Sequence, residues 1–204
     1  MKGWHFLRKD RQLRYGDNRI VEAGETYSVP DDRPLELCEY GLHASRRLTD
    51  ALGYAPGSII CRVQLIGKRI DGDDKSVAYR RRVDWMFDAT DVLCQFARRC
   101  ALDVIHLWDA PDVVVQYLKT GDESIQKAAE SAAESAPEFA ANAARTIARD
   151  ATRSAANAAR SAAESAAKSA AWSASEFATW LASRDKQNRR LTAMVMAERN
   201  RYLK

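Results

Sequence analysis

The sequence is short of the residues that mark several classes of protein. Only 9 of its 204 residues are glycine and 5 are proline, which excludes a collagen-like chain, and its 46% hydrophobic content excludes a wholly disordered one. No segment approaches the ~18 consecutive apolar residues of a membrane-spanning helix, and the N-terminus lacks the apolar core of a signal peptide. We therefore expect a folded, cytoplasmic protein that has no membrane partner.

Cysteine and histidine are also scarce. The chain has four cysteines, at positions 38, 61, 94 and 100, with no paired spacing. Such cysteines in a chain of this length are typical of reduced thiols in a core and not of a disulfide framework. The three histidines lack the spacing of a multi-histidine site, so we expect no metal ligands.

The composition changes near Gly121, and this change predicts two domains. Residues 1–120 have mixed α and β patterns, whereas residues 128–182 are dominated by alanine and serine with Pro137 as their only proline. We expect an α+β protein, in which a small, mainly antiparallel sheet with packed helices (residues 1–120) is followed by an alanine-rich, all-helical half (residues 121–204).

The first half contains short apolar runs separated by turn signals. These runs cover residues 4–7, 19–21, 26–29 and 35–38, and the strongest predicted strand covers residues 58–66, between Pro56-Gly57 and Gly67. A helix is expected to begin near Arg47. Apolar residues three and four apart predict a helix over residues 91–105, and Gly121 is expected to end a second helix that runs from Asp112 through Leu118.

The alanine-rich half predicts helices whose surfaces consist mainly of alanine and serine side chains. We expect one over residues 123–134 and a long one from about residue 136, because alanine, glutamate, lysine and arginine are strong helix formers. Serine and alanine recur every four residues, so their rows drift around the helix and form no heptad seam. Alanine buries little area, which favours packing against a partner helix and makes a homodimer a candidate assembly.

Residues 184–204 predict a final helix that is strongly basic. Seven basic and two acidic residues give it a surplus of positive charge that exceeds the +4 of the whole chain. Arg189 and Arg190 are candidate contacts for an acidic partner or nucleic acid. The alternative is a solvated helix end whose cations complement the helix dipole.

The segment Leu-Cys-Glu-Tyr-Gly-Leu-His-Ala-Ser (residues 37–45) carries the first candidate site. His43 follows a Gly-Leu turn, where its imidazole could contact a ligand or could instead hydrogen-bond the backbone and lock the turn. Tyr40 and Arg46 are the candidate binding residues beside it. Cys38 and His43 lack a third residue that would orient them as a nucleophilic pair.

Arg80, Arg81 and Arg82 form the second candidate binding site. Guanidinium groups donate paired hydrogen bonds to phosphates and stack on bases. On a strand, however, Arg80 and Arg82 would face one way and Arg81 the other. Residues 1–120 hold 19 basic and 18 acidic residues, so nucleic-acid binding by this half would need a local phosphate site.

Two resemblances add to these patterns. Residues 37–45, with Gly-Glu-Thr-Tyr before them (24–27) and Asp-Lys-Ser-Val after them (74–77), resemble an uncharacterised domain family of phages and prophages. That resemblance covers about the first 120 residues and assigns no activity. The Gly-Leu-His-Ala element also resembles the NAD-binding strand of ADP-ribosyltransferases, which implies that His43 would bind NAD with Ser45 nearby.

Three functions follow as hypotheses. The first is a non-enzymatic phage-type accessory protein that acts in the host-cell cytosol. It would bind a bacterial macromolecule, namely a host protein or protein complex, and so inhibit a defence system of the host. This function needs no cofactor and no catalytic residue. The second is an NAD-using transferase with His43 and Ser45 in the site. The third is a structural protein that self-associates through its alanine-rich helices.

Overall fold

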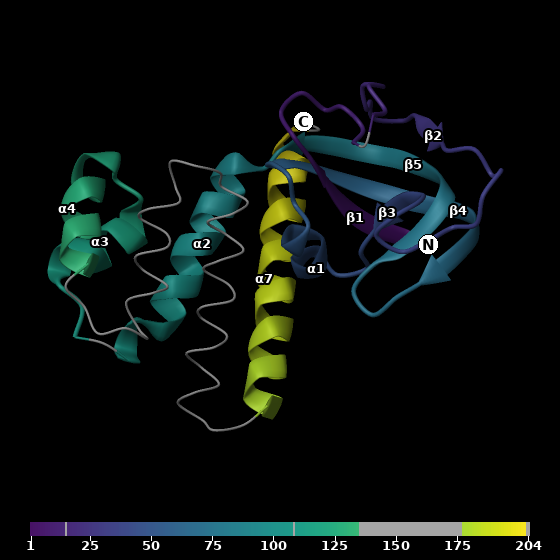
Figure 1. The fold of residues 1–204 in the computed structure, drawn as a ribbon. Helices are drawn as coiled ribbons and strands as arrows, with labels where there is room; N and C mark the ends of the chain where they lie inside the picture. Colours follow the sequence, from purple (N-terminus) through teal and green to yellow (C-terminus); the bar gives the residue numbers. More distant parts are fainter. Residues whose placement is uncertain (15, 108, 135–176, 203–204) are drawn as a thin grey trace. The chain divides into compact units, whose positions relative to one another are not determined.

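The computed structural model describes residues 1–14, 16–107, 109–134 and 177–202 (Figure 1). The chain forms two compact units, residues 1–89 and 90–204. The expected α+β class is correct for the described residues, and the sheet is antiparallel throughout its named pairs. The units divide at residue 89, whereas the composition changes near Gly121, so these are two different boundaries. The alanine-rich residues 135–176, including the long helix expected from about residue 136, lie outside the described part.

The first unit is built on a long hairpin of β4 (Ile59–Asp71) and β5 (Ser76–Asp88), visible in Figure 1. β1 (Lys2–Leu7) pairs with β4, while β2 (Thr26–Ser28) and β3 (Leu42–Ala44) pair with different parts of β5. Directly after β3, Ser45 exchanges two backbone hydrogen bonds with Trp4 on β1, at 2.8 and 3.0 Å. Hydrogen bonding therefore runs from β1 through β4, β5 and β3 and returns to β1.

Strand β4 continues beyond the end predicted for it at residue 66. Gly67 does not end the strand; it adopts a positive φ of 79° inside β4, where the register with β5 shifts between Ile66 and Arg69. A bulge of this kind lets the strand bend and continue, and glycine has no Cβ to oppose the required backbone angle. The predicted strands at residues 19–21 and 35–38 are wrong, since these segments form only isolated bridges in loops.

The two faces of this sheet have different surroundings. The inner face carries a core that includes Leu7, Cys61, Val63, Leu65 and Val83. On the outer face, Trp4, Phe6 and Ile60 are also buried, and α1 (Leu48–Gly53) packs beside β1. This helix begins where the sequence predicts it, just after Arg47. Phe87, which pairs with Ile60 on the same face, is buried as well. The outer positions Lys2, Arg62, Gln64, Arg80, Arg82 and Trp85 are half-buried or exposed.

The second unit is helical. α2 (Thr90–Val104) and α3 (Asp112–Thr120) confirm the predicted helices, and Gly121 ends α3 in the left-handed conformation with a φ of 71°. A 3₁₀ turn (Glu123–Ile125) leads into α4 (Gln126–Glu134), which confirms the prediction for residues 123–134. The C-terminal helix α7 (Phe177–Tyr202) packs on α2 and begins before the predicted residue 184.

The four cysteines differ in how deeply they are buried. Cys61 and Cys100 are buried, as predicted, and burial raises the pKa of each thiol to about 12. Cys94 is half-buried. Cys38 is exposed, so the core position predicted for it is wrong: its backbone lies in a turn with a φ of 72° and not in a strand.

Candidate functional site

The segment 37–45 folds as a turn that its histidine closes. Glu36 and Tyr40 exchange backbone hydrogen bonds across the turn at 2.9 and 3.0 Å. His43, from β3, points its Nε2 back at this turn and accepts a hydrogen bond from the Cys38 backbone N–H at 3.1 Å. Because an acceptor nitrogen must be unprotonated, this bond requires neutral imidazole at that position. Of the two roles predicted for His43, the structure shows a backbone hydrogen bond that locks the turn.

Burial and charge keep this histidine neutral. Burial lowers the pKa of His43, and the nearby Lys75 and Arg81 cations lower it further. Tyr40 is equally engaged in the fold: its hydroxyl donates to the Pro30 carbonyl oxygen at 2.6 Å, and the Arg33 guanidinium lies 3.6 Å from the centre of its ring. Both predicted binding side chains therefore hold their own loop together.

Ser45 ends this segment, and Arg46 follows it directly. Ser45 is buried, and its backbone makes the two bonds to Trp4 described above. Arg46 is exposed, with a guanidinium nitrogen 3.5 Å from a carboxylate oxygen of Asp71. The Arg69 and Ser76 side chains hydrogen-bond the same carboxylate and lower the pKa of Asp71 to about 2, with Arg46 adding to the effect. Arg46 is thus part of a surface ion-pair network.

The three consecutive arginines separate as the strand alternation predicts. Arg81 is on the inner face and only 2% exposed, whereas Arg80 and Arg82 are exposed on the outer face. The Arg81 Nη1 donates to the His43 carbonyl oxygen at 2.8 Å, its Nε is buried without a hydrogen-bond partner among the described residues, and burial lowers its pKa to about 10. This arginine joins β5 to β3 and presents nothing to solvent.

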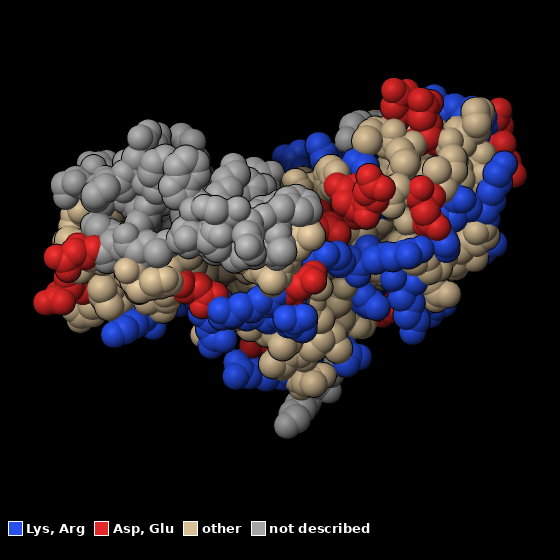
Figure 2. All heavy atoms as spheres, turned by 90° about the horizontal axis from the view of Figure 1, so that it is seen from below, with Lys and Arg blue, Asp and Glu red and all other residues tan. Residues whose placement is uncertain are grey.

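The outer face of the sheet carries the strongest concentration of accessible cations that the strand register places together. Lys2, Gln64, Arg82 and Thr26 lie opposite one another on four successive strands, and Ile66, Arg80 and Ser28 form the next row. Directly opposed residues of paired strands share a face. We call Lys2, Arg62, Gln64, Arg80 and Arg82 the outer strip. In Figure 2, basic side chains are spread across the visible face with acidic groups among them.

Two cations of the outer strip have no partner in the described part of the chain. Neither Arg80 nor Lys2 has an ion pair or side-chain hydrogen bond within the described parts of the chain, in contrast to Arg19, which is paired with Asp17 at 2.6 Å. Arg82 is half-exposed and has one loose carboxylate neighbour, Asp84, at 3.8 Å. The outer strip can therefore accept an anionic group without first breaking a tight ion pair.

An aromatic cluster borders the outer strip. Arg62 pairs across the sheet with Trp4 on one side and Trp85 on the other, and its guanidinium lies 4.5 Å from the centre of the Trp4 ring. Trp85 is half-buried; its ring meets Trp4 edge-to-face at 5.7 Å and stacks on Phe87 at 5.9 Å. These contacts hold an aromatic surface beside the cations. Sequence reasoning missed Lys2, Arg62 and Trp85, because only the strand pairing brings them together.

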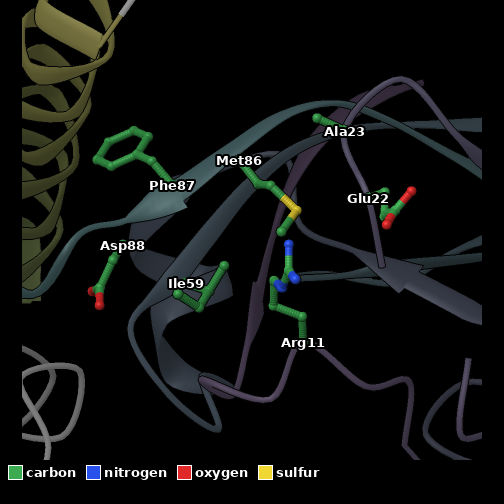
Figure 3. A pocket seen from close by; sticks show the side chains of 7 residues that line it. All are labelled: Arg11, Glu22, Ala23, Ile59, Met86, Phe87 and Asp88. Carbon is green, nitrogen blue, oxygen red and sulfur yellow. The ribbon is translucent and has the colours of Figure 1, made fainter. Parts of the chain in front are cut away.

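A cavity of about 420 Å³ lies elsewhere on the first unit (Figure 3). Ile59, Met86 and Phe87 give it an apolar wall, and in Figure 3 the Arg11 guanidinium points toward the Met86 thioether. Arg11 has a positive φ of 55°, in the loop between β1 and β2. Ile59 and Met86 are on the inner face and Phe87 is on the outer face, so this cavity lies where the β4–β5 hairpin ends and includes no residue of the outer strip.

The basic residues predicted on the last helix have separate roles. Arg190 forms a two-pronged ion pair with Asp103 of α2, at 2.7 and 3.1 Å, and Lys186 approaches the same carboxylate at 3.3 Å. Arg189 is exposed. Arg190 therefore stabilises the packing of α7 on α2, and only Arg189 of this pair faces solvent.

The described residues offer neither a metal-ligand cluster nor a membrane-spanning helix. Among the residues that the structure describes, no three His, Cys, Asp or Glu side chains gather as metal ligands. Within the same residues, no helix has the length and apolar character needed to cross a membrane. Comparisons with protein-family models, curated proteins and solved structures find no match for this chain.

Proposed function

We propose that this protein is a non-catalytic, phage-type accessory protein that binds an anionic bacterial macromolecule through the outer strip. The observation that carries the proposal is the placement of Lys2, Arg80 and Arg82 on exposed outer positions of paired strands, with Arg80 and Lys2 unpaired in the described part. Arginine donates paired hydrogen bonds to carboxylates and phosphates, so a strip of this composition recognises negative charge. The resemblance of residues 37–45 to a phage domain family supports the biological setting.

The roles of His43 and Ser45 favour binding over NAD-dependent transfer. The His43 Nε2 already accepts a backbone hydrogen bond, and Ser45 is buried at the junction of β3 and β1. A group that binds a cofactor needs a free donor or acceptor facing a cavity. These two residues instead maintain the turn and the closure of the sheet, which positions the strands that carry the outer strip.

The test is capture from bacterial lysate with matched variants. Wild type is compared with Arg80→Gln/Arg82→Gln, which removes two cations of the outer strip, and with Lys9→Gln/Lys127→Gln, which removes two exposed cations elsewhere. We expect wild type and the control variant to retain the same macromolecule, released by added salt, and the strip variant to lose it. Equal capture by the strip variant would contradict the proposal. An NAD-dependent mass increment on a target, absent with His43→Ala, would instead identify a transferase.

A further inference from the structure

We infer that the macromolecule bound by the outer strip is single-stranded nucleic acid. This inference rests on the proposed function, because it uses the same surface, and it adds the chemical class of the partner. Two observations lead to it: the cations lie on three neighbouring strands of one face of the sheet, and an aromatic ring is fixed beside them.

The spacing of the cations suits an extended chain of phosphates. Residues two apart on a strand lie ~7 Å from each other, and paired strands are ~4.8 Å apart. Arg80 and Arg82 are two apart on β5, and Lys2 reaches the same row across β4. Gln64, between Lys2 and Arg82, and the exposed Thr26 beyond Arg82 add amide and hydroxyl groups to this row. These groups can contact successive phosphates and sugars along one strand.

Trp85 supplies an aromatic ring for base stacking, which a surface made of charged groups alone lacks. Its ring is half-buried, meets Trp4 edge-to-face and stacks on Phe87, so the part that remains accessible loses little freedom when a base packs against it. Arg62, its cross-strand neighbour, is already placed over an aromatic ring and can extend the stack with its planar guanidinium. Cations combined with aromatic platforms are the common means of binding unpaired bases, which expose their faces.

The same geometry disfavours the two competing partners. A double helix is read by an element that enters a groove, typically a helix or a two-stranded ribbon, whereas the outer strip is the broad face of a sheet. The stacked bases of a duplex also leave no face for Trp85. The carboxylates of an acidic protein segment would use the arginines but have no planar ring to stack on Trp85, so binding of a purely acidic segment would depend on charge.

The experiment uses the full chain and three fluorescently labelled probes in binding titrations. The probes are a single-stranded oligonucleotide of about 16 nucleotides, the upper end of common site sizes, the matching duplex, and polyglutamate. We expect at least tenfold tighter binding of the single strand than of either other probe at equal salt. Arg80→Gln/Arg82→Gln should weaken it about tenfold or more and reduce the salt slope by about 1.4, whereas Lys9→Gln/Lys127→Gln should keep wild-type affinity.

The aromatic contribution has its own variants. Trp85→Leu should weaken single-strand binding about tenfold and leave polyglutamate binding unchanged, while Trp85→Phe, which keeps a ring, should restore most of the affinity. Thermal unfolding of each variant shows whether it is folded, and Trp85→Phe keeps the test valid if Trp85→Leu does not fold.

The outcomes separate this inference from the proposed function. Preference for the single strand, lost in the strip variant and reduced in Trp85→Leu, supports both. Equal or tighter binding of duplex or polyglutamate, still lost in the strip variant, overturns the single-strand inference and leaves the proposed function standing. Absence of binding to all three probes overturns the single-strand inference, and the capture from lysate then decides the proposed function. Binding and capture that are both unaffected by Arg80→Gln/Arg82→Gln overturn both.

Discussion

The Arg81 guanidinium donates a hydrogen bond from Nη1 to the backbone carbonyl oxygen of His43 at 2.8 Å, inside the sheet. This bond joins the arginine cluster of β5 to the histidine turn before α1, two motifs that are 38 residues apart in the sequence. It explains why one of three consecutive arginines is 2% exposed. The buried guanidinium and the neutral His43 are parts of a single arrangement that closes the sheet.

We expect Arg81→Ala to lower the free energy of unfolding by about 3 kcal/mol, because it leaves a cavity and an unpaired carbonyl at His43. Arg81→Met fills the space without a charge and should remain within about 1 kcal/mol of wild type, since burial of an unpaired cation is itself unfavourable. Urea-induced unfolding, followed by circular dichroism, measures both. Equal losses in the two variants would mean that the charge, and not the volume, stabilises this site.

The stability of the first unit should fall as the pH drops below about 6.5, the pKa of an unfolded histidine. Burial holds the pKa values of His43 and half-buried His5 below that value in the folded state, so the unfolded chain takes up protons first. The stabilising contribution is complete above that pH and is lost below it. Urea midpoints across this range should show the decline, and His43→Gln should flatten it. An unchanged slope in His43→Gln and in His5→Gln would contradict the assignment.

Two glycine substitutions separate backbone strain from steric conflict. Gly41 has a φ of 118°, and an added Cβ would clash with Val77 Cγ2 and lie 2.9 Å from Leu35 Cδ2. Gly24 also has a positive φ, of 89°, but nothing lies within 4 Å of its Cβ position. Gly41→Ala should therefore lower the free energy of unfolding by about 3 kcal/mol and Gly24→Ala by about 1. Thermal melts of the two proteins compare them, and equal losses would rule out the steric part.

The ion pair between Asp103 and Arg190 should contribute measurably to the packing of α7 on α2. A double-mutant cycle with Asp103→Asn and Arg190→Gln is expected to give a coupling energy of about 1 kcal/mol, because the pair is partly buried and two-pronged. The Glu198–Arg201 pair on the same helix, whose arginine side chain is 79% exposed, serves as the control and should couple by less than about 0.5 kcal/mol. Similar coupling in both pairs would contradict a role in packing.

Thiol labelling of the native protein tests the placement of the cysteines. Exposed Cys38 should react first with a thiol reagent, half-buried Cys94 more slowly, and the buried pair only on unfolding. The raised pKa of Cys61 and Cys100, about 12, also keeps these thiols protonated. Cys38→Ser should remove the fast phase. A fast phase that persists in this variant would show that another thiol is accessible.

Local patterns in the sequence predicted the helices of the second unit well. The apolar spacing of residues 91–105 and the Gly121 stop depend on neighbours within a few residues, and the structure reproduces both. The strand at residues 58–66 was found for the same reason. Its continuation through Gly67 was not, because a glycine that ends a strand and one that forms a bulge look alike until the partner strand is known.

The candidate site also combines one feature that a local pattern predicted with others that depend on strand pairing. Strand alternation alone predicted that Arg81 would face away from Arg80 and Arg82. It could not predict which side would be buried, nor that Lys2, from the start of the chain, would share a row with Gln64 and Arg82. Those facts depend on pairing between strands that are distant in sequence, and they define the outer strip.

The sequence by itself thus determined the α+β class, the positions of most described helices and the alternation within β5, because each follows from the φ/ψ preferences and side-chain periodicity of neighbouring residues. Only the tertiary structure decided that His43 closes a turn, that Cys38 is exposed, and that Arg62 lies between Trp4 and Trp85. Those outcomes were set by strand register and by burial, which bring together residues that no local pattern connects.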